Sequence, residues 1–560
     1  MIKVMNNIKC AKFYLVFSKK DNLTDECTLG NFREIESGCN NKWVLYSDSL
    51  NKLPVDIGNR HDNGDGIYLR IYNESNTVCF ETDELSGSPV FWAEIGDCLI
   101  IGSSIYLIIK IAEKLNLKLK IDVLSSSEYM VSGYVYSKGK TLLKNVFLLP
   151  PKSILKMNTL NGKCEIFELE SEPKYSKKRL RENEAPLRLR KTLEKGYKRY
   201  AGKKIALLLS GGGSCRILAS CAESAGLDID YFTFGQSTVN DSDFSIASNV
   251  AYKFGKKTTC FRNSGENFLK YWEKMAILSN WINDSVWWAG MIPEELFETV
   301  KNYDVVIRGD GDGFYGWGGY RVDIRDILHR FEIAMDQAIK PFEKYFVDPK
   351  KNLYPFKETR EKIIEKYTKY NRPPLELKGI LYKAIRECPA NAPGGWYFSS
   401  IVPIDTPFLW SECINIAYSL PEPRLIDRWV IFEALQMDKR LKNIPYSGSG
   451  SWDIALDFYC SGVWEELINY IQKWIPFECD IERIRNDFLK PPAIPLKNTS
   501  PIDASIDLIK LYIKKNRYLR KLAIKLFPYF THSSMSERFI VRLAMISNLN
   551  KLINETGVNL

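Results

Sequence analysis

The pattern of apolar and polar positions is most informative between residues 203 and 235. Residues 205–209 form a continuous apolar run, which predicts a strand buried on both faces of a parallel sheet. Residues 210–213 read Ser-Gly-Gly-Gly, a tight loop with almost no β-carbons, and we expect a positive φ at Gly212. Such a loop lets the phosphates of a ligand approach the backbone closely.

Helical spacing returns at Ile217, and Gly226 stands where that helix would end. A second strand is predicted at 231–234, which completes a strand–helix–strand unit with the loop at the carboxyl end of its first strand. The loop lacks the Gly-Lys-Ser/Thr that closes a Walker motif, and Arg216 stands where dinucleotide fingerprints and nucleophile elbows need a glycine. These three classes of site are therefore excluded.

Residues 1–175 show a different pattern, in which short β-rich runs alternate with turns. This alternation predicts an antiparallel α+β layer domain. A charged connection follows, then a helix expected at 186–200, and we place the second domain at 185–560. The runs lie at 14–17, 67–71, 77–81, 90–93 and 98–102, with a helix expected at 106–115.

Composition narrows the class of protein. The 560 residues are 45% apolar, and the net charge of +10 is spread over 78 basic and 68 acidic side chains, which is weak support for nucleic-acid binding. Thirteen cysteines without CxxC pairs indicate reduced thiols, and we expect a cytoplasmic protein without a signal peptide. The longest hydrophobic run, 98–112, is too short to span a membrane, and three scattered histidines argue against a histidine metal cluster.

The loop Ser-Gly-Gly-Gly-Ser-Cys resembles the pyrophosphate loop Ser-Gly-Gly-x-Asp-Ser of ATP pyrophosphatases, and more closely that of glutamine-dependent asparagine synthetases. The resemblance implies an adenine nucleotide α-hydrolase-like parallel sheet that binds ATP. By the same resemblance, the backbone of Thr233 and Phe234 would edge the adenine, and Gly309 would lie beside the nucleotide. The other implied nucleotide contacts are Leu209, Ser210, Gly211, Gly212, Gly213, Ser214 and Cys215.

A second motif, Arg-Gly-Asp-Gly-Asp-Gly, follows an apolar run at 303–307. Two carboxylates directly after a buried strand suit Mg²⁺, which takes oxygen ligands and substrate phosphates. The motif is similar to the Gly-Glu-Gly-x-Asp-Glu of the same family, in which the first acid acts on the attacking amine and the aspartate binds magnesium. That resemblance gives Asp310 the catalytic role and Asp312 the metal, while a shifted register puts Asp310 on the metal as well.

The amino-terminal domain resembles the Ntn-hydrolase-like glutaminase domain of this family. The fit is best at Gly-Tyr-Val-Tyr from Gly133 and at 143–151. A working glutaminase needs an amino-terminal cysteine, whereas residue 2 is Ile2, and no counterpart of the arginine that clamps glutamine is present. We therefore expect a degenerate domain that does not hydrolyse glutamine.

Two departures concern the synthetase site. Ser214 replaces the second magnesium aspartate of the loop, and Tyr446 stands near the place of the lysine that steadies the transition state. Lys442, Arg428 or Arg424 are the alternatives for that cation. Further along the resemblance, residues 401–409 match a segment that ends in aspartate in the family, where this chain has Trp410.

The resemblance implies an amide-forming synthetase that adenylates a carboxylate with ATP and Mg²⁺ for attack by an amine or ammonia. Its partners would be a small-molecule or peptide carboxylate and an amine, with no nucleic acid and no membrane span, and a homodimer is compatible with it. The alternative is an eroded relative that binds a nucleotide or a protein partner. Residues 450–560 are helical by pattern, and 506–527 predict a packed helix with a basic face.

Overall fold

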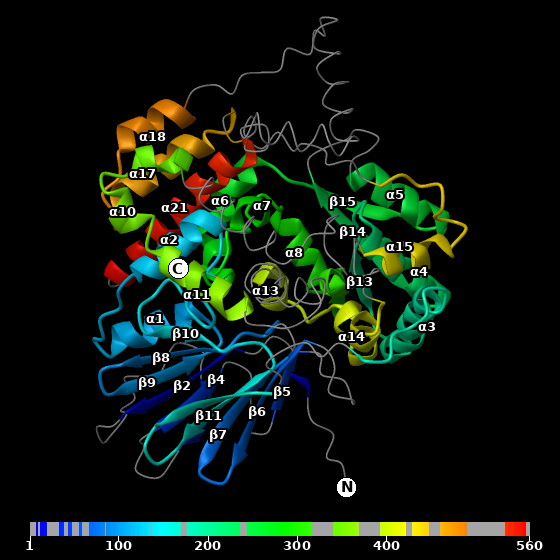
Figure 1. Cartoon of the computed structure of the whole chain (residues 1–560), viewed down its shortest axis with the longest axis horizontal. Coiled ribbons are helices and arrows are strands. Elements are labelled where there is room, and N and C mark those ends of the chain that lie inside the picture. The colour runs from blue at the N-terminus through cyan, green and yellow to red at the C-terminus, as the bar shows by residue number, and fades with distance from the viewer. Residues whose placement is uncertain are drawn as a thin grey trace, which may run out of the picture.

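The computed structural model describes residues 7–8, 12–18, 33–37, 43–47, 55–58, 67–83, 86–135, 137–169, 176–235, 243–315, 340–368, 393–421, 428–446, 458, 460–489 and 533–555. These residues form a mixed α/β structure with two largely antiparallel sheets and one parallel sheet (Figure 1). The predicted combination of an α+β part and a parallel α/β part is therefore present. Ile2, Arg424 and the helix expected at 506–527 lie outside the described residues.

Two six-stranded sheets form the amino-terminal β-sandwich. Their strand orders are β1-β5-β6-β7-β11-β12 and β10-β8-β9-β2-β4-β3, and β1 pairs with β5 in parallel while the other neighbours are antiparallel. All five predicted runs coincide with strands of these sheets. The strands are β1 (Asn7–Ile8), β2 (Phe13–Ser18), β3 (Arg33–Ser37), β4 (Trp43–Ser47), β5 (Val55–Gly58), β6 (Tyr68–Glu74), β7 (Thr77–Thr82), β8 (Phe91–Ile95), β9 (Cys98–Gly102), β10 (Val146–Leu148), β11 (Ser153–Asn158) and β12 (Cys164–Glu168).

The central strand β2 is buried along its whole length, because its sheet is covered on both faces. Phe13 and Leu15 enter the core between the two sheets, where the ring of Phe13 stacks on that of Phe80 at 5.6 Å. Tyr14 and Val16 point the other way, into a core that they share with the helices. Such double burial explains why β2 is a continuous apolar run rather than an alternating one.

The helices above this sheet are α1 (Ile105–Lys114) and α2 (Val123–Ser132). Each begins at a side-chain cap, because Ser104 accepts from the Leu107 amide and Asp122 accepts from the Ser125 amide. The first helix packs its apolar face on β8 and β9. The second ends at Gly133, which adopts the left-handed conformation with φ 85°.

The parallel sheet has the strand order β15-β14-β13-β16-β17. Its strands are β13 (Ile205–Leu208), β14 (Ile229–Gly235), β15 (Thr258–Arg262), β16 (Val305–Ile307) and β17 (Ile404–Asp405). Because the chain leaves β13 toward β14 and later returns to its other side with β16, the order reverses between β13 and β16. In parallel α/β sheets, ligands bind at the carboxyl end of such a reversal.

Helices cover both faces of the parallel sheet (Figure 1). One apolar core contains residues of α3, α4, α5, α14 and α15. The other contains residues of α6, α8 and α13 and continues into the β-sandwich. These helices are α3 (Ala185–Tyr197), α4 (Gly213–Ser224), α5 (Asp243–Lys253), α6 (Gly265–Leu278), α7 (Val286–Ala289), α8 (Glu294–Val300), α13 (Pro393–Ser399), α14 (Ser411–Tyr418) and α15 (Trp429–Gln436).

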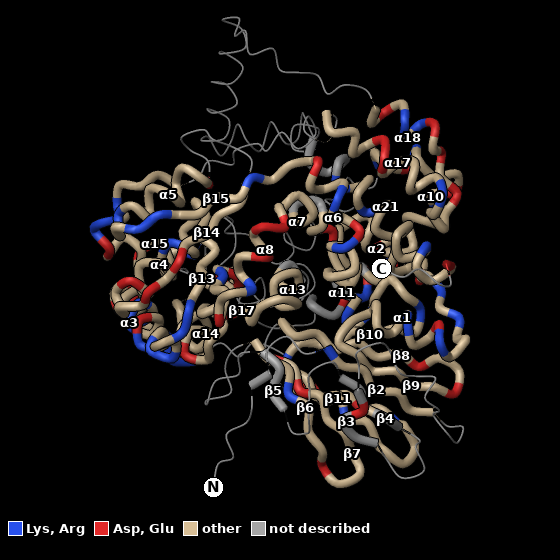
Figure 2. The backbone as a smooth tube through the Cα atoms, turned by 180° about the vertical axis from the view of Figure 1, so that it is seen from behind, with Lys and Arg blue, Asp and Glu red and all other residues tan. Residues whose placement is uncertain are grey.

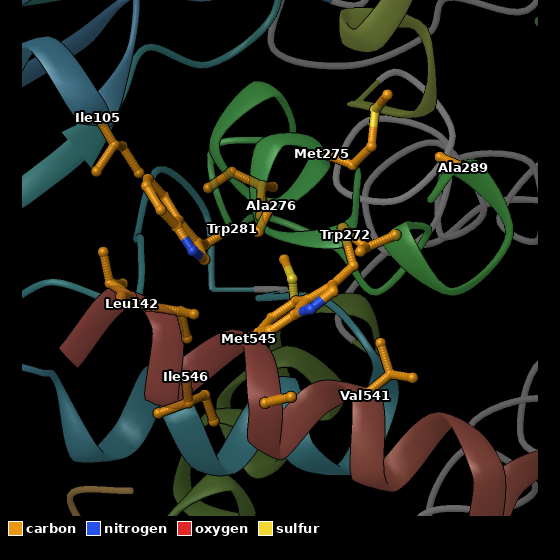
Figure 3. Packing of buried hydrophobic residues seen from close by; sticks show 14 of the residues in the cluster. Ile105, Leu142, Trp272, Met275, Ala276, Trp281, Ala289, Val541, Met545 and Ile546 are labelled. Atoms are coloured by element: carbon orange, nitrogen blue, oxygen red, sulfur yellow. The ribbon is translucent and has the colours of Figure 1, made fainter. Parts of the chain in front are cut away.

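The two parts of the chain share one hydrophobic core, and α21 (Ser533–Asn554) lies within it. Figure 3 shows Val541, Met545 and Ile546 of α21 among apolar side chains that include Trp272 and Trp281. Polar contacts reinforce this packing: the buried Arg542 guanidinium pairs with Asp284 at 2.8 Å and donates to backbone carbonyls of α2. The β-sandwich and the parallel-sheet part are therefore joined by a common interior.

The remaining described elements are helical, as the pattern after residue 450 predicts. In the described part of the chain, no helix is both long and apolar enough to cross a membrane. Figure 2 shows that Lys and Arg alternate with Asp and Glu on the outer helices such as α3, as expected for solvated faces. The further elements are α10 (Pro349–Asn352), α11 (Phe356–Thr368), α17 (Val463–Trp474) and α18 (Ile481–Phe488), with 3-10 turns η3 (Lys198–Tyr200), η4 (Asp312–Tyr315), η5 (Lys340–Tyr345) and η7 (Pro407–Leu409).

Candidate active site

The glycine-rich loop lies between β13 and α4, at the carboxyl edge of the central strand. Helix α4 begins at Gly213, so the expectation that helical structure starts at Ile217 is wrong by one turn. The expected positive φ at Gly212 is also wrong: Gly212 is the helix N-cap with φ −78° and ψ 160°, an extended conformation. The loop is therefore short, and it presents the N-terminus of a twelve-residue helix at the sheet edge.

The loop is fixed by hydrogen bonds at the amides of its first two glycines. The Gly211 amide donates to Asp243 Oδ1 at 2.7 Å, and the Gly212 amide donates to the Ser210 hydroxyl at 3.2 Å. Asp243 stands at the first turn of α5, so a carboxylate of the neighbouring unit holds the loop. Because of these bonds, the loop conformation is set before any ligand arrives.

Arg216, in the first turn of α4, holds the loop through hydrogen bonds to backbone carbonyls. Its buried guanidinium donates to the carbonyl of Gly211 at 2.8 Å and to that of Ile444 at 3.0 Å, and it also bonds the Pro445 carbonyl. Burial lowers the pKa of the Arg216 guanidinium. The residue that occupies a glycine's place in other phosphate loops is thus a structural tie between α4 and the segment after α15.

The acidic motif follows β16, the strand beside β13. Asp310 pairs with Arg308 at 2.9 Å, and Asp312 begins the 3-10 turn η4. Gly309 allows the two motifs to meet, because a β-carbon there would lie 3.0 Å from the Cys215 sulfur. The structure therefore brings the predicted loop and the predicted carboxylates together at the switch point.

Asp312 is the centre of the polar contacts at this site. Its Oδ2 atom accepts from Arg428 Nη1 at 2.6 Å and also from the Ser214 hydroxyl. Arg428 is the residue before α15 and lies in the left-handed region with φ 56°. Of the two candidate cations that the structure describes, Arg428 reaches the acidic motif, whereas Lys442 is exposed on a turn and forms none of these ion pairs.

Burial changes the proton affinity of two groups here. It raises the pKa of Asp310, an effect that the Arg308 guanidinium opposes and the Asp312 carboxylate reinforces. Burial likewise raises the pKa of the Cys215 thiol, whose sulfur lies 3.5 Å from the Ser210 hydroxyl. The site therefore holds one carboxyl group that accepts a proton more readily than an exposed one, and a thiol that stays neutral.

The remaining predicted contacts lie along the same edge of the sheet. Leu209 is buried, and its amide donates to the Phe232 carbonyl at 2.8 Å. Thr233 and Phe234 lie near the carboxyl end of β14, which is next to β13 in the sheet. They are in place to border a ligand that lies across these strands.

The residues do not fit a magnesium ion as they stand. Each carboxylate of the acidic motif is already neutralised by a guanidinium, Asp310 by Arg308 and Asp312 by Arg428. The Ser214 hydroxyl, at the position of a family aspartate, donates to Asp312 rather than offering a charge. Within the described residues, no group of three or more His, Cys, Asp or Glu side chains could hold a metal. The Asp310–Asp312 magnesium site therefore stays a prediction, and these ion pairs disfavour it.

The residues do fit a nucleotide. The first amides of α4 have no partner within the helix and favour an anion. Arg428 is paired with Asp312, but its Nε has no hydrogen-bond partner among the described residues and offers a further donor. A β-carbon at Gly212 would meet only the Ser210 hydroxyl, at 3.4 Å, so the backbone there has open space. Just after β15, the neighbour of β14 in the sheet, the buried side chain of Asn263 has no hydrogen-bond partner among the described residues, at either Oδ1 or Nδ2. An unused amide pair of this kind suits the edge of an adenine.

Sequence reasoning missed three residues of this site. Arg308 is the first residue of the acidic motif and was given no role, although a charged residue between a buried strand and a glycine is a signal that could have been used. Asp243 begins the helix after β14, where an acidic first turn is common, so its contact with Gly211 carried no distinct signal. Asn263 follows the edge strand β15, and only the fold shows that it is buried.

Comparisons with known proteins leave the family open. No family model matches this chain, and no curated protein matches it. Among solved structures, one described as the allosteric regulatory enzyme of purine biosynthesis aligns with 10% identity over 35% of this chain and 47% of that chain, with a TM-score of 0.13. The aligned part thus spans about half of that protein, and a TM-score this low supports no conclusion about fold or function.

Proposed function

We propose that this protein is an ATP-dependent amide-forming synthetase of the asparagine-synthase type. The observation that carries the proposal is the meeting of two motifs at one switch point: the glycine-rich loop after β13 and the acidic motif after β16. A carboxylate oxygen of the substrate would bond to the α-phosphorus of ATP as pyrophosphate leaves. An amine or ammonia would then bond to the acyl carbon as AMP leaves.

The described residues suggest a division of labour in this reaction. The N-terminus of α4 would hold the phosphates, and Arg428 would stabilise the negative charge that develops on them. Asp310 would accept the proton of the attacking amine, because its raised pKa makes it a better base than an exposed carboxylate. The β-sandwich would supply no ammonia of its own, because the segment that clamps glutamine in the family has no counterpart here.

A second candidate is a nucleotide-binding protein without catalysis. The two Arg–Asp pairs favour it, because carboxylates that already have cationic partners are less available to a metal or to an amine. In that case the loop would bind ATP or AMP as a signal or a structural ligand. The two candidates share the binding site and differ in turnover.

Pyrophosphate release, measured across candidate small-molecule and peptide carboxylates, separates them. For the synthetase we expect turnover in the wild type and a loss of about two orders of magnitude, or about 3 kcal/mol, in Asp310→Asn. Asp230→Asn is the matched control, since Asp230 lies on β14 at the opposite edge of the same sheet and bonds the Tyr303 hydroxyl at 2.6 Å. Nucleotide binding without turnover on any substrate supports the second candidate, and equal turnover in both variants rules out the role of Asp310.

A further inference from the structure

We infer that the guanidinium of Arg428 takes the place of a divalent cation at this site, so that the loop binds nucleotide phosphates without Mg²⁺. This inference deepens the proposed function, on which its nucleotide part depends. It starts from the Asp312 carboxylate, the group on which the family resemblance places a metal. In this chain that carboxylate bonds Arg428 at 2.6 Å and the Ser214 hydroxyl on the same oxygen.

The arginine is held in position by the fold. Arg428 adopts a left-handed backbone conformation, which a non-glycine residue keeps only where its surroundings enforce it. It directly precedes α15, and Phe432 of that helix packs against Gly213 at the start of α4. The helix that carries the arginine is thus fixed against the phosphate loop, and the guanidinium is part of the loop's own scaffold.

The charges at the site are already balanced. Two carboxylates, Asp310 and Asp312, face two guanidiniums, Arg308 and Arg428. A divalent ion at Asp312 would have to displace Arg428 and would gain no third carboxylate, because position 214 is serine. Mg²⁺ prefers carboxylate and phosphate oxygens, whereas a guanidinium can pair with a carboxylate and a phosphate at once through its five N–H groups. The serine at position 214 and the guanidinium of Arg428 therefore both disfavour a divalent ion at Asp312.

The metal part of the inference is tested with Mn²⁺ alone, followed by electron paramagnetic resonance. We expect no stoichiometric uptake by the wild type at about 1 mM Mn²⁺. The double variant Ser214→Asp with Arg428→Gln should gain one site, because it restores a carboxylate and removes the competing cation. The matched control is Arg440→Gln, which breaks another Arg–Asp pair, to Asp438 at 2.7 Å, away from the loop. Stoichiometric Mn²⁺ uptake by the wild type overturns the inference.

The nucleotide part is tested on the wild type by calorimetric titration of ATP, once with Mg²⁺ and once with EDTA. We expect affinities that agree within about twofold, and a loss of at least about tenfold in Arg428→Gln under both conditions. A tenfold weaker affinity in EDTA for the wild type contradicts the inference. If ATP binds in neither condition while the Mn²⁺ results are as expected, the proposed function fails and the assignment of Arg428 to the cation's place is supported.

Discussion

Gly213 and Phe432 are in such close contact that a β-carbon on Gly213 would lie 2.7 Å from the Phe432 ring. One is the first residue of α4, and the other lies on α15. The neighbouring Gly212, by contrast, has space for a β-carbon. Glycine is therefore needed at these two positions for different reasons: packing against Phe432 at Gly213, and access to the backbone at Gly212.

We predict that Gly213→Ala destabilises the fold by about 1–3 kcal/mol, because Phe432 would have to move. The free energy of unfolding of Gly212→Val should lie within about 1 kcal/mol of the wild-type value, because the backbone at this position is extended. This variant should nevertheless lose nucleotide binding. Denaturant titration and calorimetry measure the two effects. If Gly212→Val binds ATP as the wild type does, the loop is only a turn.

Gly196→Ala sets two effects of opposite sign against each other. Alanine is favoured over glycine inside a helix by about 1 kcal/mol, and Gly196 lies within α3. A β-carbon there, however, would lie 2.2 Å from the ring of Trp410, which is fully buried. We expect the clash to win, with a net loss of about 1–3 kcal/mol in chemical denaturation.

The companion variant is Trp410→Leu combined with Gly196→Ala. It should lose less stability than the two single variants lose together, because the smaller side chain makes room for the new methyl group. Strict additivity would show that Gly196 and Trp410 do not interact. The result also bears on Trp410, which in the structure is a packing residue whose indole nitrogen donates to buried Asp405 at 3.2 Å.

Asn263→Leu should affect stability and binding in opposite directions. Asn263 buries two polar atoms that have no partner among the described residues, so an apolar side chain of similar size should be neutral or stabilising by about 1 kcal/mol. If its amide contacts adenine, ATP affinity should fall about tenfold, or about 1.4 kcal/mol. Thermal unfolding measures the effect on stability, and ATP titration measures the effect on affinity. An unchanged ATP affinity would show that Asn263 does not contact the nucleotide.

A pH effect is expected at the Asp438–Arg440 pair. Burial alone would raise the pKa of Asp438, but hydrogen bonds from Arg440 and Ser220 outweigh it and hold that pKa below its usual value. A lowered carboxyl pKa stabilises the fold above the usual pKa and ceases to do so as the pH falls through the lowered one. Arg440→Gln should therefore cost about 1–2 kcal/mol at pH 7.

That cost should shrink as the pH falls through the pKa of Asp438 in the folded variant, and it should vanish below the lowered pKa in the wild type, because a protonated carboxyl no longer pairs with the guanidinium. Urea titrations of both proteins at several pH values give the difference directly. A difference that stays constant from pH 7 to acid would mean that the pair does not set the pKa of Asp438.

The sequence predicts the regular elements well, because their signals are local. The run 98–102 is β9, and Gly226, expected to end a helix, follows α4 with φ 73°. The helix start was missed by one turn, since Gly213 and Ser214 are poor helix formers and give no local signal for a helix.

The motifs of the candidate site could be predicted from the sequence, but the ion pair between Asp312 and Arg428 could not. Nothing local links Asp312 to Arg428, which lie 116 positions apart, and the sequence could not choose among three cations. Which cation reaches the acidic motif follows from how α15 packs on α4. The family resemblance pointed to a metal at Asp312, and the contact that disfavours it comes from that packing.

The position of helix α21 has a consequence for folding during synthesis. The helix is buried beside α2, α6 and α17, so the amino-terminal half lacks part of its interior until residues 533–554 exist. On the ribosome, the β-sandwich emerges long before the segment that closes its helical side. The nascent chain therefore exposes an apolar surface through most of its synthesis, and chaperones would bind it during that time. A chain truncated before residue 533 would keep this surface exposed and would be degraded rather than function as a shorter protein.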